Sequence, residues 1–460
     1  MNNSCIAYII ASNVQKTFCF KLSRGVLVNY SLLTNYYLLN TIMRQSKLFT
    51  KTRKELPADE VAKNAQLLIR AGYIYKNMAG AYSFLPLGLR VIEKINEIIR
   101  EEMDSIGGQE IHMPTLQEPS LWQKSDRWDD AKVDVWFKTD LKAGGEVGLA
   151  WTHEEVITDI MRQYISSYKD LPLFTYQIQT KFRNEMRAKS GIMRTREFWM
   201  KDLYSFCATE EQHNEFYEAC ALAYMRIFNR IGIGDKTYRT FASGGAFTKF
   251  SHEFQTLAEA GEDVVYVNED KKVAVNEEVL NEVDLSELGV TKDELVERKS
   301  IEVGNIFSLG TKFSEALGLL YKDGAGEQHP VIMGSYGIGP ARAMGTVVDL
   351  LSDEKGIVWP ASVAPFLVHL VGLNSDDSEL KDYADGIYEA LSKRGVEVLY
   401  DDRDARPGEK FADSDLLGMP YRVVVSKKTK EEGKFEVVTR ATGEIRYLTE
   451  EELFADFAND

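Results

Sequence analysis

Residues 181–201, KFRNEMRAKSGIMRTREFWMK, concentrate side chains suited to binding a phosphorylated ligand. The segment carries a local charge of +5, from seven Lys/Arg and two Glu, in a chain whose net charge is −16. Arg183 and Glu185 follow an expected strand, and Arg194 and Phe198 come after a loop. Guanidinium groups suit phosphates, a carboxylate suits an amine, and a phenyl ring suits the face of a base. The pattern predicts an antiparallel hairpin that grips a nucleoside triphosphate.

Several elements are expected to position this hairpin. Apolar residues at helical spacing predict a helix over residues 87–103, followed by a short strand at 110–114 that ends in proline. Residues 174–182 read as the first strand of the hairpin, and 210–231 as a long helix. Residues 262–300 are acidic and weakly patterned, which predicts a solvated excursion or a small helical insert.

Beyond Trp359-Pro360 the pattern changes to alternating strands and helices. The expected order is strand, helix, strand, helix, strand at residues 366–371, 379–394, 396–400, 411–417 and 421–426. Such alternation predicts a small α/β domain with a mostly parallel sheet.

Composition limits the class of protein. The 460 residues permit two or three domains, and 44% hydrophobic with 27% charged residues is typical of a globular protein. Four cysteines without a CxxC pair predict neither a disulfide framework nor a structural zinc site. No apolar run reaches the ~18 residues of a membrane helix, so we expect no membrane partner.

The N-terminal region is unusual because residues 1–54 carry eight Lys/Arg and no Asp or Glu. Such a leader fits either an organellar transit peptide or a start codon assigned too early, with Met43 as the natural start. We favour the second interpretation and a cytoplasmic protein; the alternative is the mitochondrial matrix. Residues 1–42 are left out of the fold argument.

Two short matches to other motifs are weak. His153-Glu154 begins like HExxH, but Ile157 occupies the position of the second histidine, which disfavours a metalloprotease. The glycine-rich segment at 334–342, GSYGIGPAR, is not GxGxxG and lies far from any leading βαβ unit.

Taken together, the segments resemble class II aminoacyl-tRNA synthetases. Motif 2 of that class reads F-R-x-E, a loop, and R-x-x-x-F-x-x-x-D/E, and this chain has FRNE at 182–185 followed by Arg194, Phe198 and Asp202. The helix at 87–103 with the strand ending at Pro114 resembles motif 1, and GIGPAR at 337–342 resembles motif 3. The three occur in the order of the class.

Within that class the chain resembles the prolyl-tRNA synthetases. The matching segments are TxEE at 152–155, REFWMKDLYSF at 196–206, SHEF at 251–254, IEVGNIFSLGTKFSEAL at 301–317, GSYGIGPAR at 334–342 and the tail at 401–425. The resemblance covers about 45–460, with 262–300 unmatched. It implies an α+β class II catalytic domain at 43–360, built on an antiparallel sheet flanked by helices. A C-terminal α/β anticodon-binding domain follows at 364–460.

The resemblance also implies ATP-dependent activation of L-proline and its transfer to tRNA(Pro), with residue roles that fit this chemistry. Activation joins two anions, so the site must neutralise charge. Arg183 would clamp the α-phosphate and the substrate carboxylate, while Arg342 and Phe198 would sandwich adenine. The ATP-binding set is Arg183, Glu185, Arg194, Phe198, Glu302, Asn305 and Arg342, with Arg183 and Arg342 as catalytic residues. Glu302 and Asn305 would hold Mg²⁺.

For proline, Thr152 and Glu154 would bind the imino group, because its positive charge requires a carboxylate. Arg183, Met200, Tyr204, His252 and Phe247 would complete that pocket; the less favoured alternative for Met200 and Tyr204 is plain core packing. Arg187 and Lys189 would meet the acceptor end of tRNA, and Arg403 and Lys410 the anticodon stem and loop. The run Lys427-Lys428-Lys430 is a further candidate for the anticodon stem or an ordinary solvated turn.

The family resemblance leaves defined alternatives. We expect a homodimer without the large editing domain that bacterial relatives commonly carry between motifs 2 and 3, hence no hydrolysis of Ala-tRNA(Pro) in cis. One rival is a threonyl or glycyl enzyme, which the missing Cys/His/His zinc set disfavours for threonine. The other is a catalytically inactive paralogue, which the presence of Arg183 and Arg342 disfavours.

Overall fold

The computed structural model describes residues 42–58, 60–186, 188–243, 250–373 and 377–457. The chain divides into two compact units. The larger unit comprises residues 50–365 and 415–418, and the smaller unit comprises the segment up to residue 49 together with 366–414 and 419–460. The leader expected at residues 1–42, apart from Ile42, lies outside the described residues, as do Arg187 and Phe247. Within the described ranges, no helix combines the length and the apolar character that crossing a membrane requires.

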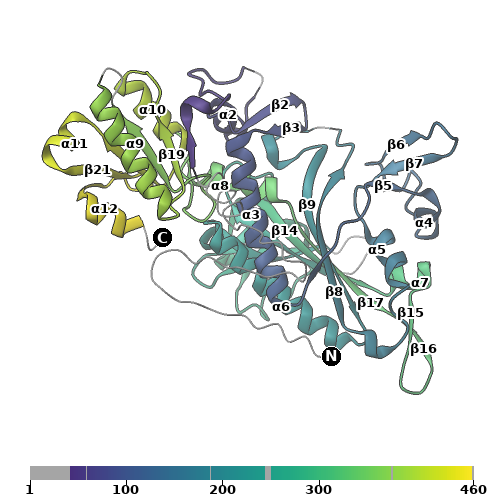
Figure 1. The fold of residues 1–460 in the computed structure, drawn as a ribbon. Helices are drawn as coiled ribbons and strands as arrows, with labels where there is room; N and C mark the ends of the chain where they lie inside the picture. The colour runs from purple at the N-terminus through teal and green to yellow at the C-terminus, as the bar shows by residue number, and fades with distance from the viewer. Residues whose placement is uncertain (1–41, 59, 187, 244–249, 374–376, 458–460) are drawn as a thin grey trace, which may run out of the picture. The chain divides into compact units, whose positions relative to one another are not determined.

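A nine-stranded, mostly antiparallel sheet forms the centre of the larger unit (Figure 1). The β8–β9 hairpin is followed across the sheet by β17 and the long β14. Among the described strands of this sheet, only β4–β8 and β10–β13 pair in parallel. The strands, in spatial order, are β11 (Phe250–Leu257), β10 (Thr237–Ser243), β13 (Val273–Asn276), β12 (Asp263–Asn268), β14 (Val296–Gly310), β17 (Ile332–Ile338), β9 (Glu197–Cys207), β8 (Leu173–Phe182) and β4 (Gln109–Glu110).

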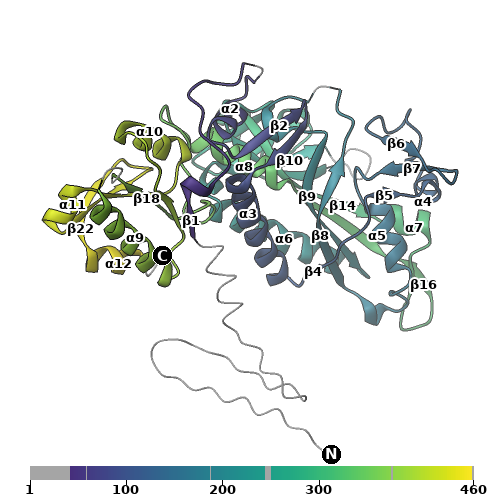
Figure 2. The same cartoon turned by 45° about the horizontal axis from the view of Figure 1, so that its top comes forward.

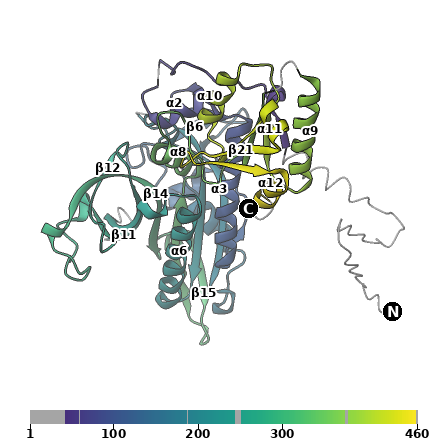
Figure 3. The ribbon, with the colours of Figure 1, turned by 90° about the vertical axis from the view of Figure 1, so that its left-hand side faces the viewer.

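Two long helices, α3 (Pro86–Ser105) and α6 (Glu210–Arg230), run side by side along one face of this sheet (Figure 3). Helix α3 begins with Pro86 in its first turn and buries the stripe predicted from its apolar spacing, which includes Ile92, Ile95 and Ile99. Helix α6 is capped by Thr209, whose hydroxyl accepts a hydrogen bond from the Gln212 backbone N–H at 3.2 Å. These helices leave the opposite face of the central strands for the site.

Smaller elements surround the sheet (Figure 2). A β5–β7–β6 sheet and α4 lie beside α5 and α7 in both Figure 1 and Figure 2. These elements are α2 (Lys63–Arg70), β2 (Ile74–Met78), β3 (Ala81–Phe84), β5 (Leu116–Gln117), α4 (Pro119–Lys124), β6 (Phe137–Asp140), β7 (Glu146–Leu149), α5 (Glu154–Met161), η2 (Tyr168–Asp170), η3 (Gly191–Met193), α7 (Lys312–Leu317), β15 (Leu320–Lys322), β16 (Gln328–Pro330) and α8 (Pro340–Leu351).

Residues 262–300 differ from the expected solvated or helical insert. They form β12 and β13, which join the central sheet, followed by two short 3-10 turns, η5 (Glu277–Val279) and η6 (Lys292–Glu294). Val265, Val267 and Val275 are completely or almost completely buried there. The β-branched residues of DVVYVN and VAVN favour strands, and the acidic residues around them concealed this pattern in the sequence.

The smaller unit has the predicted α/β organisation. Four parallel strands, β1 (Ile42–Arg44), β19 (Val398–Asp401), β18 (Val368–Gly372) and β20 (Tyr421–Val425), are followed by antiparallel β21 (Lys434–Thr439) and β22 (Ile445–Thr449). Its helices are α9 (Ser378–Lys393), α10 (Pro407–Leu417), α11 (Lys427–Glu432) and α12 (Glu450–Phe457). The segment around Met43 belongs to this unit because β1 pairs with β19, whereas we predicted that residue 43 begins the catalytic domain.

Candidate active site

The β8–β9 hairpin predicted from the sequence is present and delivers the key arginine. Lys181 pairs with Phe198 and Phe182 with Glu197, which places Arg183 at the very end of β8. The Arg183 backbone N–H donates to the Arg196 carbonyl at 2.8 Å and so closes the base of the loop. After this point the side chains no longer alternate between the two faces of the sheet, and those of Arg183 and Glu185 line a pocket.

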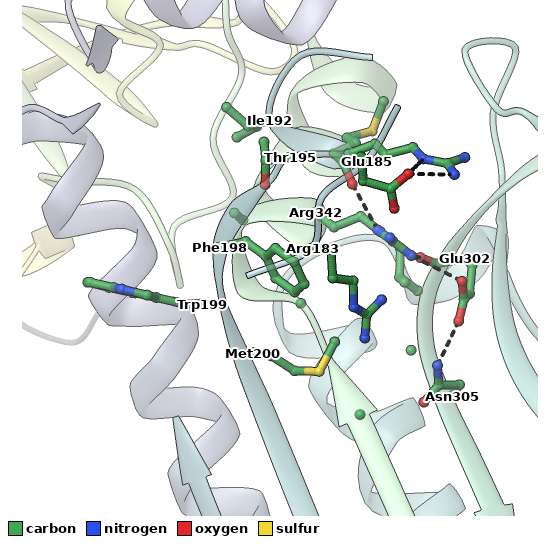
Figure 4. A pocket seen from close by; sticks show the side chains of 17 residues that line it. Arg183, Glu185, Ile192, Thr195, Phe198, Trp199, Met200, Glu302, Asn305 and Arg342 are labelled. Atoms are coloured by element: carbon green, nitrogen blue, oxygen red, sulfur yellow. Dashed lines mark hydrogen bonds and ion pairs between the residues drawn. The ribbon is translucent and has the colours of Figure 1, made fainter. Parts of the chain in front are cut away.

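That pocket is open, has a volume of about 530 Å³ and is walled by β9, β14, β17 and the start of α8 (Figure 4). Both predicted catalytic arginines, Arg183 and Arg342, face it. Eight predicted residues line it: Arg183, Glu185, Arg194, Phe198, Met200, Glu302, Asn305 and Arg342. Segments separated by more than a hundred positions in the chain thus meet around one cavity.

Arg183 has an unbalanced positive charge. Its guanidinium carbon lies 5.3 Å from the centre of the Phe198 ring, and its Nε has no hydrogen-bond partner. Among the described residues no carboxylate forms an ion pair with it. Burial, and then repulsion from Arg342, lowers the pKa of Arg183 from its ordinary value. A partly buried guanidinium that forms no ion pair favours an anionic ligand.

Arg342 is held in place more firmly. It follows Pro340, the first residue of α8, and its Nη1 donates to the Glu302 carbonyl at 2.9 Å and to the Glu302 carboxylate at 3.1 Å. Its Nε donates to the Met193 carbonyl at 3.0 Å. These three contacts orient the planar guanidinium while leaving it on the pocket wall, where a planar ligand can stack against it.

The Glu302–Asn305 pair does not fit a ready-made Mg²⁺ site. The Asn305 amide N–H donates to Glu302 Oε1 at 2.8 Å, and Arg342 occupies Oε2. Both carboxylate oxygens therefore already accept hydrogen bonds, and Asn305 presents donor hydrogens there, whereas Mg²⁺ requires oxygen ligands.

Thr152 and Glu154 form a compact acceptor group at the start of α5. The Thr152 hydroxyl lies 2.7 Å from both Glu154 carboxylate oxygens, and the Ser335 hydroxyl donates to Oε1 at 3.4 Å. All of Glu154 except 6% is buried. A largely buried carboxylate at this place suits a cationic nitrogen.

An almost completely buried network of Lys181, Asp202 and His153 supports the Thr152–Glu154 loop. Lys181 Nζ lies 2.7 Å from Asp202 Oδ1 and 2.7 Å from His153 Nδ1. Because an ammonium group can only donate, Nδ1 must accept, and the proton on Nε2 points to the Pro114 carbonyl at 3.0 Å. Burial, and then the charge of Lys181, lowers the pKa of His153 to about 4. The imidazole is thus a neutral link between the loop and Pro114, which lies beyond β4 because the strand predicted at 110–114 spans only Gln109–Glu110.

Tyr204 belongs to the same network. Its hydroxyl donates to Asp202 Oδ2 at 2.9 Å and lies 3.3 Å from the His153 backbone nitrogen. Gln177 donates to the same carboxylate oxygen at 3.0 Å. Met200 and Tyr204 were each predicted either to wall the proline ring or to belong to the core. Met200 lines the pocket, whereas Tyr204 is only 1% exposed.

The prediction that His252 lines the proline pocket is wrong. His252 pairs across the sheet with Ile306, and Ile306 with Tyr336, whereas the pocket residue Asn305 occupies the adjacent position of its strand. Neighbouring residues of a strand face opposite sides. His252 therefore lies on the face covered by α6, with Nδ1 2.9 Å from the Tyr217 hydroxyl.

The residues predicted to meet tRNA have different surroundings. Lys189 is half-exposed and pairs with Glu262 at 3.0 Å. In the smaller unit Arg403 pairs with Asp401 at 2.7 Å and with Asp413 at 2.8 Å. Lys410 is only 1% exposed and donates to the Gly372 carbonyl at 2.7 Å, so its amine does not reach the surface as we expected.

Sequence reasoning missed several residues around Glu154. Arg127 and Ser335 contact its carboxylate, and Lys181 and His153 support its loop. His153 was considered only as part of a metalloprotease motif. One signal in the sequence could have indicated this network: side chains alternate along β9, so Asp202 and Tyr204 lie on the same face of the strand as the predicted site residue Phe198.

Comparison with known proteins identifies the family. The model of the class II tRNA synthetase core domain (G, H, P, S and T) matches residues 136–350, and that of the anticodon binding domain matches 367–459. A proline–tRNA ligase of Agrobacterium fabrum is 39% identical over 432 residues, which cover 88% of this chain and 98% of the relative. The chain belongs to the prolyl-tRNA synthetase family.

Other members of the prolyl-tRNA synthetase family support the same assignment. The proline–tRNA ligase of Caulobacter vibrioides is 41% identical over 428 residues, covering 87% of this chain and 96% of the relative. That of Bacillus mycoides is 35% identical over 567 aligned positions, covering 91% of this chain and 100% of the relative. The fold is similar to that of a Cryptosporidium parvum prolyl-tRNA synthetase solved with L-proline and AMP, with a TM-score of 0.69, 19% identity and coverage of 86% and 75% of the two chains.

Proposed function

We propose that this chain is a proline–tRNA ligase, which activates L-proline with ATP and transfers it to tRNA(Pro). The observation that carries the proposal is the convergence of the unpaired Arg183 and the fixed Arg342 on one pocket. Family membership and a pocket built for an anion both support this reaction.

In the first step, a carboxylate oxygen of proline forms a bond to the α-phosphorus of ATP, and the bond from that phosphorus to the pyrophosphate oxygen breaks. Both reactants are anions, so Arg183 lowers the barrier by neutralising the charge that gathers between them. Phe198 and Arg342 hold adenine by its faces, and Glu185 accepts a hydrogen bond from its amino group. Arg194, which contacts Glu185 at 3.0 Å, lies at the outer end of the pocket for the distal phosphates.

The proline side would be read by Thr152 and Glu154, with Met200 against the ring. The carboxylate of Glu154 accepts hydrogen bonds from the cationic imino nitrogen. In the second step, a terminal ribose hydroxyl of tRNA attacks the carbonyl carbon of the prolyl-adenylate, its proton leaves, and AMP departs. Lys189 and Arg187 would guide the acceptor end, and Arg403 the anticodon end. Lys410 would act only by holding the backbone around Arg403.

Pyrophosphate exchange into ATP, measured separately with each amino acid, tests the proposal. We expect exchange that depends on proline. Dependence on threonine or glycine would favour the related enzymes, and no exchange with any amino acid would favour a non-catalytic paralogue. We expect Mg²⁺ to enter with the ATP phosphates rather than on the Glu302–Asn305 pair, so Glu302→Gln should leave the magnesium requirement of the exchange unchanged.

We also propose that the enzyme lacks editing of Ala-tRNA(Pro) in cis. The alignment with the Bacillus mycoides relative has 567 positions, whereas this chain has 460 residues, so that relative carries at least roughly a hundred residues without counterpart here. Between motifs 2 and 3, β10 to β13 belong to the central sheet and leave no separate domain among the described residues. Incubating the purified enzyme with Ala-tRNA(Pro) tests this, and rapid deacylation would refute it.

A homodimer is the proposed assembly. Strand β4 is the outermost strand of the sheet, pairs with β8 through two residues, and exposes both of them, Gln109 and Glu110. An open strand edge of this kind suits contact with a second copy. Sedimentation equilibrium at micromolar concentration would give twice the chain mass, and a strict monomer would contradict the proposal. N-terminal sequencing of the mature protein separates the proposed cytoplasmic location from a mitochondrial one.

A further inference from the structure

Arg127 lies outside the nucleotide pocket but contacts the carboxylate proposed to bind proline. Its Nη1 is 3.2 Å from Glu154 Oε2 and 3.0 Å from Glu155 Oε1. Only 10% of its side chain is exposed, and the side chain of Glu155 is completely buried. A single guanidinium nitrogen therefore serves two neighbouring carboxylates away from bulk water.

An aromatic lobe fixes this guanidinium. Its carbon lies 4.3 Å from the centre of the Trp151 ring, 5.1 Å from that of Phe313 and 5.4 Å from that of Trp122. The backbone of Arg127 is held at both ends, because its N–H donates to the Trp122 carbonyl at 2.9 Å and its carbonyl accepts from the Trp136 indole at 2.9 Å. The lobe is formed by the β5–β7–β6 sheet and α4 beside α5 (Figure 2). So many contacts give the guanidinium one orientation.

The two carboxylates differ in their other partners. Glu154 also accepts hydrogen bonds from the Thr152 and Ser335 hydroxyls and reaches toward the proposed proline site. Glu155 points into the core, where Ser125 donates to its Oε1 at 2.6 Å and its Oε2 has no hydrogen-bond partner. Burial raises the pKa of Glu155 to about 7, although Arg127 acts against this rise. Two adjacent carboxylates in a buried site repel each other unless they share a cation.

We propose that Arg127 is a positioning residue for proline recognition, which holds the Glu154 carboxylate in one orientation toward the proline site by sharing its guanidinium between Glu154 and Glu155. The inference rests on the proposed role of Glu154 as the partner of the imino group. Without Arg127 the repulsion between the two adjacent carboxylates is no longer balanced by a shared cation, and Glu154 leaves the orientation in which it meets the cationic nitrogen. ATP binds on the other side of the site, so its affinity is independent of Arg127.

The test is steady-state pyrophosphate exchange with Arg127→Met, Arg127→Lys, Glu155→Gln and the double variant Arg127→Met/Glu155→Gln. For Arg127→Met we expect the KM for proline to rise at least about thirtyfold, because a hydrogen bond to a charged group is lost. The KM for ATP should stay within about twofold of the wild-type value. In the double variant only one carboxylate remains, so the repulsion is absent and most of the proline affinity returns. Equal changes in both KM values, or a double variant no better than Arg127→Met, would overturn the proposal.

Controls separate this inference from the proposed function. Arg162→Met removes an exposed arginine at the end of α5, where it pairs with Asp159 at 2.8 Å, and should leave both KM values unchanged. If the unmodified enzyme and this control show no proline-dependent exchange, the proposed function fails. If both are active and Arg127→Met does not fold, Arg127→Lys decides. It keeps the charge but loses the planar guanidinium that lies 4.3 Å from the centre of the Trp151 ring, so a rise of at least about fivefold in the KM for proline alone is expected, and an unchanged KM contradicts the inference.

Discussion

The two ends of the proposed active site, the proline end and the nucleotide end, are built in opposite ways. At the proposed proline end, Lys181, Asp202 and His153 are almost completely buried and joined by contacts of 2.7 Å, and Glu154 has Thr152 within the same distance. At the nucleotide end, Arg183 lacks a counter-ion, and its neighbour Arg194 is half-exposed.

The difference indicates how the work is divided. A small, rigid amino acid is best recognised by groups that do not move, because preorganised groups lose little freedom on binding. ATP brings its own negative charge, so the nucleotide end can remain electrostatically unsatisfied until ATP arrives. We therefore expect substitutions at the nucleotide end to lower mainly the activity. Substitutions in the buried network of the proline end should lower mainly the stability.

Replacing Arg183 should have the largest effect on activity. For Arg183→Met we expect the rate of proline-dependent exchange to fall at least about 10³-fold, because the developing charge loses its main donor. Stability should stay the same or rise, because burial and Arg342 both disfavour the charged form of Arg183. Exchange kinetics and thermal melting measure the two effects. Arg298→Met, an exposed arginine on β14, is the matched control, and a lower melting temperature for Arg183→Met would contradict this view of the nucleotide end.

Breaking the buried pair at the proline end should act mainly on stability. Lys181→Met leaves Asp202 as a buried charge without its cation, which costs about 3–5 kcal/mol of unfolding free energy. Urea unfolding measures this loss, with Lys169→Met on the surface turn η2 as the control. A change below about 1 kcal/mol would mean that Asp202 is solvated or otherwise compensated.

Acid should weaken the proline end through His153. Its pKa is about 4 in the folded protein against 6.5 unfolded, so the unfolded chain takes up the proton first as the pH falls. Stability from this residue is complete above pH 6.5 and declines by about 3 kcal/mol as the pH drops toward 4. His153→Gln should reduce the slope of unfolding free energy against pH over this range. Equal slopes for the wild type and His153→Gln would refute the assignment.

The smallest effect is expected from Glu185 at the open rim. Its ion pair with Arg194 is partly exposed, so Glu185→Ala should change the unfolding free energy by less than about 1 kcal/mol. Losing the acceptor for the adenine amine should still raise the KM for ATP about tenfold. Melting curves and ATP titrations at saturating proline measure both, with Glu118→Ala on the surface before α4 as the control. An unchanged KM would remove Glu185 from the nucleotide site.

The sequence predicted the nucleotide end better than the proline end for a physical reason. Arg183, Phe198 and Arg342 are recognisable because phosphate and base binding require a few residue types at fixed spacing. The support of Glu154 comes from Arg127 and Lys181, whose importance depends on which strands and lobes meet in space. No local spacing encodes such contacts.

Register explains the remaining differences. His252 stands in a motif that resembles the family, but one step along β11 moves a side chain to the other face of the sheet. In the smaller unit, Lys410 reads as a surface cation, yet α10 turns it inward to bonds with backbone carbonyls. Element types followed from the sequence, with α3, α6 and the β8–β9 hairpin as clear examples, whereas the facing of single side chains did not.

A crystal structure with a non-hydrolysable prolyl-adenylate analogue tests the contrast between the two ends most directly. The account predicts that Arg183 binds the phosphate oxygens, that Arg342 stacks on adenine, and that Lys181, Asp202 and His153 keep their present contacts. An analogue bound away from Arg183 and Arg342, or a Lys181–Asp202 pair that separates when the analogue binds, would contradict it.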